Sequence, residues 1–271
     1  MTSWVDGQPC ASLALADRGL AYGDGLFETI GVRAGRPRLL ERHLSRLEDG
    51  ARRLSIPLDR ALVGREIQAF AALHGEAVIK LILTRGEGPR GYAAPAPVHP
   101  RRVLLGHSPA AYPARHAEEG VSLFPCVTRL AEQPLLAGLK HLNRLEQVLA
   151  RAEWSDSRLA EGLLRDVHGR VIEGVYSNLF LARNGVLATA DLSRCGVAGV
   201  MRAELIEQAV RIGVPVEVRD IPHEDLLEAD EVFLCNSQYG VWPVRAIGEH
   251  RWPVGALTRK LQGIARGLLD S

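Results

Sequence analysis

Three features of this sequence have residue types that could together form a catalytic or cofactor site. They are a lysine, a glutamate and a glycine-rich turn. Lys140 stands between leucines, and a buried lysine amine of low pKa can form a Schiff base with a carbonyl group. Glu173 ends a predicted strand, where a carboxylate could pair with a ring nitrogen. Residues 195–202 contain two glycines that lead into a predicted helix, whose free N–H groups favour an anion such as phosphate. With a basic helix at about residues 40–54, these are the parts that a site for pyridoxal phosphate would need.

Each of these features also has an ordinary structural explanation. Lys140 could be a surface lysine whose stem covers the leucines, Glu173 a solvated charge, and residues 195–202 a plain glycine-rich connection. A second glycine pattern, residues 86–91, matches G-x-G-x-x-G, but prolines follow it where a dinucleotide site requires a helix. We therefore expect a flexible loop there, on which Arg85 and Arg90 could bind a carboxylate.

The charge balance excludes a global attraction to nucleic acid or to an anionic membrane. The 271 residues include 33 Lys and Arg against 32 Asp and Glu, a net charge of +1. No run approaches ~18 apolar residues, so we expect no membrane span. The chain opens without a basic segment followed by an apolar core, and we expect a cytoplasmic protein.

The histidines and cysteines do not predict a metal site. The nine histidines are scattered without H-E-x-x-H, and the four cysteines form no C-x-x-C pair. Wide cysteine spacings indicate four buried thiols in a reducing cytosol rather than a disulfide framework. The sequence also lacks the G-x-S-x-G turn of many serine hydrolases.

The predicted elements divide the chain into two α/β domains of a mixed (α+β) protein. Residues 1–107 form the first domain, residues 108–116 a linker, and residues 117–271 a second domain that carries Lys140. In the first domain, Asp6-Gly7 predicts a tight hairpin, and apolar spacing predicts a helix from about 40 to 54. Strands are predicted at residues 26–33, 78–83 and 103–105.

The second domain is predicted to alternate hairpins with helices. Asn143 should cap a helix with Glu146 as its partner, and Leu145, Val148 and Leu149 should form the apolar face of that helix. Asn184-Gly185 predicts another tight hairpin. Further elements are predicted as a hairpin turning at 168–169, a helix over 201–212 and strands over 214–218 and 231–235.

The order of these segments resembles the fold-type-IV pyridoxal phosphate enzymes. That group includes branched-chain aminotransferases, D-amino-acid aminotransferases and 4-amino-4-deoxychorismate lyases. The resemblance covers essentially the whole chain and is carried by residues 17–29, 43–47, 140–149, 173–180 and 195–202. It implies a two-domain fold like that of D-amino-acid aminotransferase.

Within that group, residues 85–92, 140–149 and 195–202 are most similar to the lyases. Leu145 stands where branched-chain aminotransferases commonly have a tyrosine near the cofactor ring. The resemblance therefore implies a lyase of folate biosynthesis that converts 4-amino-4-deoxychorismate to 4-aminobenzoate and pyruvate. The alternatives are a D-amino-acid or branched-chain aminotransferase, which needs the same lysine and glutamate, and a non-catalytic member that binds the cofactor or a partner.

The resemblance also implies roles for individual residues. Lys140 would hold pyridoxal 5'-phosphate and later move protons, and Thr29 would help to direct them. Glu173 would pair with the pyridine nitrogen, with Asn178 beside the ring. The phosphate would be bound by Arg46, the N–H groups of Val200 and Met201, and the Ser237 hydroxyl. Substrate contacts would come from Tyr22, Arg90, Tyr92 and Asn236. A homodimer is expected by analogy with the group.

Overall fold

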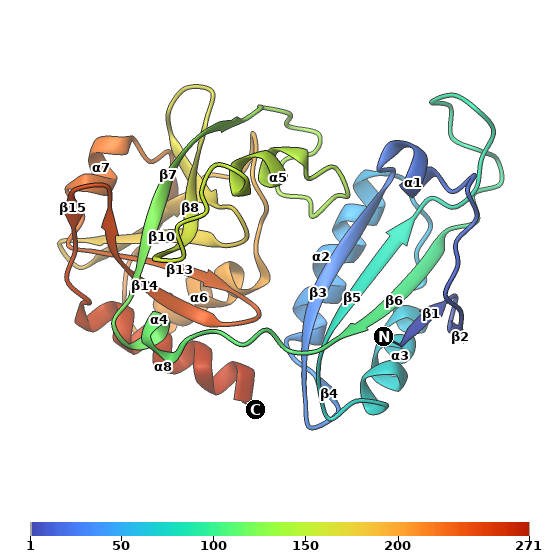
Figure 1. The fold of residues 1–271 in the computed structure, drawn as a ribbon, viewed down its shortest axis with the longest axis horizontal. Helices are drawn as coiled ribbons and strands as arrows, with labels where there is room; N and C mark the ends of the chain where they lie inside the picture. Colours follow the sequence, from blue (N-terminus) through green and yellow to red (C-terminus); the bar gives the residue numbers. More distant parts are fainter. Residues whose placement is uncertain (1, 271) are drawn as a thin grey trace. The chain divides into compact units, whose positions relative to one another are not determined.

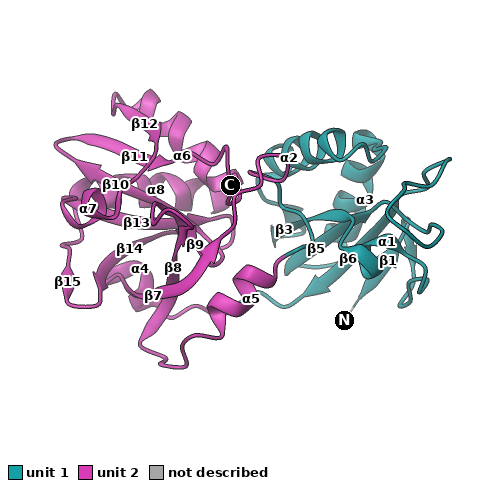
Figure 2. Ribbon diagram, turned by 90° about the horizontal axis from the view of Figure 1, so that it is seen from above, with its two compact units in different colours: residues 1–110, 139–143 teal, residues 111–138, 144–271 magenta. Residues whose placement is uncertain are grey.

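The computed structural model describes residues 2–270, which divide into two compact units (Figure 2). Unit 1 runs to Ala110 and also includes Leu139–Asn143; unit 2 consists of Ala111–Gly138 and the chain from Arg144 onward. Helix α4 (Ala114–Glu118) begins directly after Pro113, so it occupies part of the segment 108–116 that was expected to be a linker. The mixed α+β fold that the sequence predicts is confirmed.

Unit 1 is built on six antiparallel strands in the order β2-β1-β6-β5-β3-β4 (Figure 1). Alternation along β3 and β5 buries Leu26, Ile30 and Leu81 in a core that includes side chains of α2 and α3. Phe27 and Thr29 lie on the opposite face of β3 and are partly buried. The strands are β1 Ser3–Val5, β2 Gln8–Pro9, β3 Gly25–Arg33, β4 Arg36–Pro37, β5 Glu76–Thr84 and β6 Arg101–His107. The helices are α1 Arg18–Tyr22, α2 Leu40–Arg53 and α3 Arg60–Ala72.

Unit 2 is a mixed sheet of nine strands in the order β12-β11-β10-β13-β14-β7-β8-β9, with β15 paired to β14. An additional pairing of β9 with β10 joins Glu173 to Asn178. The strands are β7 Val121–Leu130, β8 Leu159–Asp166, β9 Val171–Gly174, β10 Asn178–Arg183, β11 Val186–Ala190, β12 Val216–Arg219, β13 Glu231–Asn236, β14 Gly240–Ile247 and β15 His250–Arg251. The helices other than α4 are α5 Leu145–Arg151, α6 Val200–Arg211, α7 His223–Leu227 and α8 Ala256–Asp270.

The two tight hairpins are where the sequence predicts them. Asp6 and Gly7 have φ values of 51° and 77°, and Asn184 and Gly185 have φ values of 50° and 79°. Two consecutive positive φ values are the requirement of a type I′ turn, which Asp-Gly and Asn-Gly meet at low cost. These turns therefore fix the register of β1 with β2 and of β10 with β11.

The predicted cap of α5 is wrong. Arg144 is the N-cap residue, and no side-chain hydrogen bond caps the helix. Asn143 Nδ2 instead donates to Gly23 O at 3.2 Å, and Glu146 Oε1 accepts from Ala131 N at 2.8 Å. Both side chains form hydrogen bonds with residues outside the helix, and these tertiary contacts replace the local capping box.

The predicted apolar face of α5 is also not buried within the chain. Leu145, Val148 and Leu149 are 74%, 60% and 61% exposed. Ala150 is the one buried residue of the helix. The helix thus presents an uncovered apolar stripe, a feature that often marks an interaction surface.

Candidate active site

Lys140 belongs to unit 1, which corrects its assignment to the second domain. Phe27 N donates to Lys140 O at 2.9 Å, and Leu142 N donates to Gly25 O at 3.0 Å. Leu139 is buried in the core of unit 1. The chain therefore leaves unit 2 after Gly138, pairs with β3 around His141, and returns to unit 2 at Arg144.

Two lysine amines lie over one aromatic ring on the open face of the unit 1 sheet. The Nζ atom of Lys140 is 4.4 Å from the centroid of the Phe27 ring, and the Nζ atom of Lys80 is 5.3 Å from the same centroid. Thr29 is paired with Lys80 across β3 and β5, so its side chain shares that face. The structure thus brings Thr29 to the side of the sheet where the Lys140 amine lies. Lys80 was not predicted as a site residue.

Arg46 is held by a buried carboxylate. Its Nε donates to Glu28 Oε1 at 2.8 Å, and its Nη2 donates to Glu28 Oε2. The Nδ1 atom of His43 lies 2.6 Å from Glu28 Oε2, and the side chains of Glu28 and His43 are both 1% exposed. Burial opposes ionisation of Glu28, but the charge and hydrogen bonds of Arg46 outweigh it and lower the pKa of Glu28 to about 2. This bidentate pair fixes the guanidinium for which the family resemblance implies a phosphate role.

In unit 2, the predicted glutamate, amide and glycine turn come together. Glu173 Oε2 accepts from Val197 N at 2.8 Å, and Asn178 Nδ2 donates to Val197 O at 2.8 Å. The same Asn178 nitrogen lies 3.5 Å from Glu173 Oε2. The two side chains are 4% and 5% exposed. The two ends of one turn, Glu173 and Asn178, thus share a hydrogen-bonded cluster with Val197, which is about 20 residues further along the chain.

The start of α6 fits an anion. Gly199 is its N-cap, and none of the described side chains caps it, so the N–H groups of Val200 and Met201 lie in the uncapped first turn. A Cβ atom on Gly199 would lie 2.0 Å from Asn178 Oδ1, which explains the glycine. An uncapped helix start beside a buried carboxylate is the donor set that a pyridine ring with a phosphate group requires.

The remaining predicted residues lie in turns. Asn236 Oδ1 accepts from Gln238 N and Tyr239 N at 2.9 and 3.0 Å, which shapes the turn containing Ser237. Asn236 Nδ2 donates to Tyr176 O at 3.3 Å. The Asn236 amide is therefore engaged in the turn, while Ser237 Oγ accepts from Gln238 Nε2 at 3.3 Å.

The predicted substrate residues of unit 1 lie on or against the loop after β5. Gly91 N donates to Tyr22 Oη at 3.0 Å, and the rings of Tyr22 and Tyr92 are 5.5 Å apart. Tyr92 is 89% exposed, and Arg90 is exposed as well. Arg85 is instead bound to Asp24 and to the carbonyl groups of Leu54 and Ser55, so its guanidinium has a structural role.

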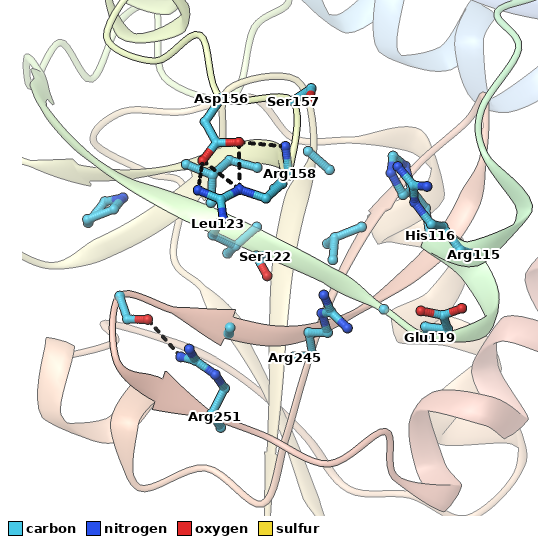
Figure 3. Close-up of a pocket in the computed structure, with 17 residues that line it drawn as sticks. Arg115, His116, Glu119, Ser122, Leu123, Asp156, Ser157, Arg158, Arg245 and Arg251 are labelled. Carbon is cyan, nitrogen blue, oxygen red and sulfur yellow. Dashed lines mark hydrogen bonds and ion pairs between the residues drawn. The ribbon is translucent and has the colours of Figure 1, made fainter.

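A cavity of about 560 Å³ in unit 2 is lined by none of the predicted site residues (Figure 3). Its walls include Arg115, Arg158, Arg245 and Arg251, and Arg158 is paired with Asp156 at 2.7 Å. The lining comes from α4, the residues just before β8, the beginnings of β7 and β8, the end of β14, and β15. The cavity is separate from the cluster of Glu173 and Asn178.

Residues 2–270 contain no group of three metal-ligating side chains and no helix long and apolar enough to cross a membrane. All four cysteines are free. Cys126, Cys195 and Cys235 are buried, and burial raises the pKa of each thiol to about 12. Cys10 is partly exposed, which corrects the expectation of four buried thiols.

Comparison with known proteins agrees with the predicted resemblance over the full chain. A curated aminodeoxychorismate lyase of Vibrio harveyi is 40% identical and covers 96% of this chain and 98% of its own length. A D-alanine aminotransferase of Bacillus licheniformis is 28% identical, with coverage of 92% and 88%.

Solved structures give the same result. The 4-amino-4-deoxychorismate lyase of Pseudomonas aeruginosa is 67% identical, with a TM-score of 0.98 over 99% of this chain and 100% of the other. The Escherichia coli branched-chain amino acid aminotransferase shares the fold, with a TM-score of 0.85 at 24% identity and coverage of 99% and 94%. The family model of amino-transferase class IV matches residues 25–247. This chain is therefore a member of the class IV aminotransferase family.

Proposed function

We propose that this protein is a lyase that converts 4-amino-4-deoxychorismate to 4-aminobenzoate and pyruvate in folate biosynthesis, with pyridoxal 5'-phosphate as cofactor. One observation carries the proposal: a lyase of that name is 67% identical over 99% of the chain, with a TM-score of 0.98. The positions of Lys140, Glu173 and the start of α6 support the cofactor assignment, because an amine, a buried carboxylate and an anion site are all present.

The cofactor, when bound, supplies an electron sink for negative charge at the carbon that carries the substrate nitrogen. Lys140 holds the cofactor through Nζ, and the same nitrogen later takes the proton from that carbon. Thr29, on the same sheet face, helps to direct the proton. Glu173, fixed by Val197 N, holds a proton on the pyridine nitrogen, and Asn178 lies beside the ring.

Anionic groups are bound by local donors rather than by a basic surface. Arg46, oriented by Glu28, binds the cofactor phosphate together with the N–H groups of Val200 and Met201 and the Ser237 hydroxyl. The substrate has two carboxylates, and Lys80 and Arg90 are the cations of unit 1 that we assign to them. Tyr22, Tyr92 and Asn236 complete the proposed substrate contacts.

The role of Lys140 provides the test of this proposal. The purified protein with pyridoxal phosphate should release 4-aminobenzoate, and borohydride should fix the cofactor covalently to Lys140 in a peptide map. Lys140→Ala should lose more than about 10³-fold in turnover because it removes the proton carrier. Its thermal unfolding should match that of the wild type. Multiple turnovers by Lys140→Ala would refute the assignment.

We also propose that the protein is a cytoplasmic homodimer. The exposed Leu145, Val148 and Leu149 of α5 form an apolar stripe that a second copy of the chain would cover. Four free thiols fit a reducing compartment.

A further inference from the structure

Glu161 on β8 is a fully buried carboxylate with no part in the chemistry proposed for the cofactor and substrate. Its Oε1 accepts from Gly162 N and Val175 N, both at 3.0 Å. Its Oε2 accepts from Ser177 Oγ at 3.0 Å and from Tyr176 N at 3.4 Å. Burying a carboxyl group is costly unless its oxygens are satisfied, so a fold that directs four donors to one carboxylate invites a functional explanation.

Three of the four donors lie in a single turn between β9 and β10. Gly174 N donates to Ser177 O at 2.8 Å, which closes the turn. A Cβ atom on Gly174 would lie 2.2 Å from Ser177 Oγ and 3.1 Å from the carboxyl carbon of Glu161. The turn is therefore packed directly onto the Glu161 carboxyl group, with no room for a side chain at Gly174.

This turn separates the two residues assigned to the cofactor ring. Glu173 is the residue before Gly174, and Asn178 is the residue after Ser177. Their backbones are paired, and their side chains lie 3.5 Å apart on a shared partner, Val197. Any change in the path of the turn would therefore move the Glu173 carboxylate relative to the Asn178 amide.

We propose that Glu161 is a positioning residue that holds the turn over residues 174–177 and thereby fixes Glu173 and Asn178 for the cofactor ring. The inference rests on the proposed function, because that function is what places Glu173 at the ring nitrogen. A carboxyl group is suited to this position because its two oxygens accept hydrogen bonds from four donors. A glutamine amide would turn an NH₂ group toward either the Val175 side or the Ser177 side and lose those bonds.

Glu161→Gln tests the proposal, with Asp166→Asn as a matched control. Asp166 lies on the same strand, is also 0% exposed, and accepts from His168 N and Arg170 N in the turn between β8 and β9. Each variant therefore weakens the hydrogen bonds from one carboxyl group to one turn of unit 2. Only the turn bound by Glu161 joins Glu173 to Asn178. The measurements are the dissociation constant of pyridoxal phosphate, from titration of the apoprotein, and the pH dependence of the bound cofactor's absorbance.

We expect Glu161→Gln to weaken cofactor binding by about 10-fold or more, a typical effect of removing the group that orients a ligand-binding side chain. It should also shift the pH midpoint of the cofactor absorbance, which follows the proton on the nitrogen that joins the cofactor to Lys140 and depends on the charge at the ring nitrogen. Asp166→Asn should leave the dissociation constant within about two-fold of the wild-type value and the pH midpoint within about 0.2 pH units of it. Equal effects of the two variants, or none from Glu161→Gln, would overturn the proposal.

Two further variants keep the outcomes distinguishable. Glu173→Gln should itself shift the absorbance midpoint; if it does not, the proposed function fails along with the inference. If Glu173→Gln shifts it and Glu161→Gln does not, the inference alone fails. Should Glu161→Gln not fold, Ser177→Ala removes one donor from the same carboxylate and must weaken cofactor binding in the same direction, or the inference is wrong.

Discussion

Glu28 shows how a single buried carboxylate can organise a site that no motif reveals. It lies on the core face of β3, where it binds Arg46 and His43 from α2. Burial is the chief reason that the pKa of His43 is lowered, which favours the neutral imidazole, and Arg46 is the cation that binds Glu28. The family resemblance implies a phosphate role for Arg46, but the partner that orients it comes from strand pairing and helix packing.

The depressed pKa of Glu28 predicts a specific pH dependence. A carboxylate whose folded-state pKa lies near 2, against an ordinary value of 4.5, stabilises the fold above pH 4.5 and loses that contribution as the pH falls toward 2. Glu28→Gln should therefore unfold at a lower temperature than the wild type at pH 6–7, with a gap that narrows below pH 4.5. Thermal unfolding at several pH values measures it. A gap that stayed constant down to pH 3 would contradict the ion pair.

Glu161 predicts the opposite trend. Burial raises its pKa to about 8, outweighing the hydrogen bonds that favour the charged form. A carboxyl group with a raised folded-state pKa contributes stability at low pH and loses it as the pH rises through that value. The difference in unfolding temperature between wild type and Glu161→Gln should therefore shrink between pH 5 and pH 9. Glu28→Gln is the internal control, because its gap does not change in this range. A gap for Glu161→Gln that widened with pH would refute the assignment.

At the scale of single elements, α5 is the feature that a lone chain leaves unexplained. Its apolar residues recur at helical spacing, but in this chain they face outward. If a second copy covers them, Leu149→Glu should convert a dimer to a monomer in light scattering, because it buries an unpaired charge in the interface. Val210→Glu on α6, which is 62% exposed, is the matched control and should leave the mass unchanged. A dimer that survived Leu149→Glu would place the interface elsewhere.

Turn chemistry and strong periodicity made some elements predictable. Asp6-Gly7 and Asn184-Gly185 formed tight turns because their positive φ values follow from residue type alone. The helix predicted over residues 40–54 is α2, and the helix over 201–212 is α6. Helix α3 was missed although its N-cap, Asp59, accepts from Leu62 N at 2.9 Å, a local signal that the sequence does contain.

Elements set by long-range pairing could not be read from the sequence. Residues 139–143 lie in the second half of the sequence, which led to their assignment to the second domain. Their backbone pairs with β3, however, so Lys140 belongs to unit 1. Asn143 had the residue type of a cap, yet its side chain binds Gly23. Lys80 was missed because only the register of β3 with β5 places it near Phe27. Local patterns identified residue types, whereas strand register decided which of them meet.

For the whole molecule, a net charge of +1 is compatible with an anionic substrate and cofactor because the cations assigned to them are few and individually oriented. Lys140, Thr29 and Arg46 belong to unit 1, and Glu173 and Asn178 to unit 2. Lyase and aminotransferase activities would use the same lysine and glutamate, so the distinction between them lies in the products.

The most direct test of the central claim is the product balance without any keto-acid acceptor. The holoenzyme supplied with 4-amino-4-deoxychorismate alone should release 4-aminobenzoate and pyruvate in equal amounts over many turnovers, because a lyase needs no second substrate. Adding a keto acid should leave that rate unchanged. If turnover instead required the keto acid, with amino acids consumed and no 4-aminobenzoate formed, the protein would be an aminotransferase and the proposed lyase function would be wrong.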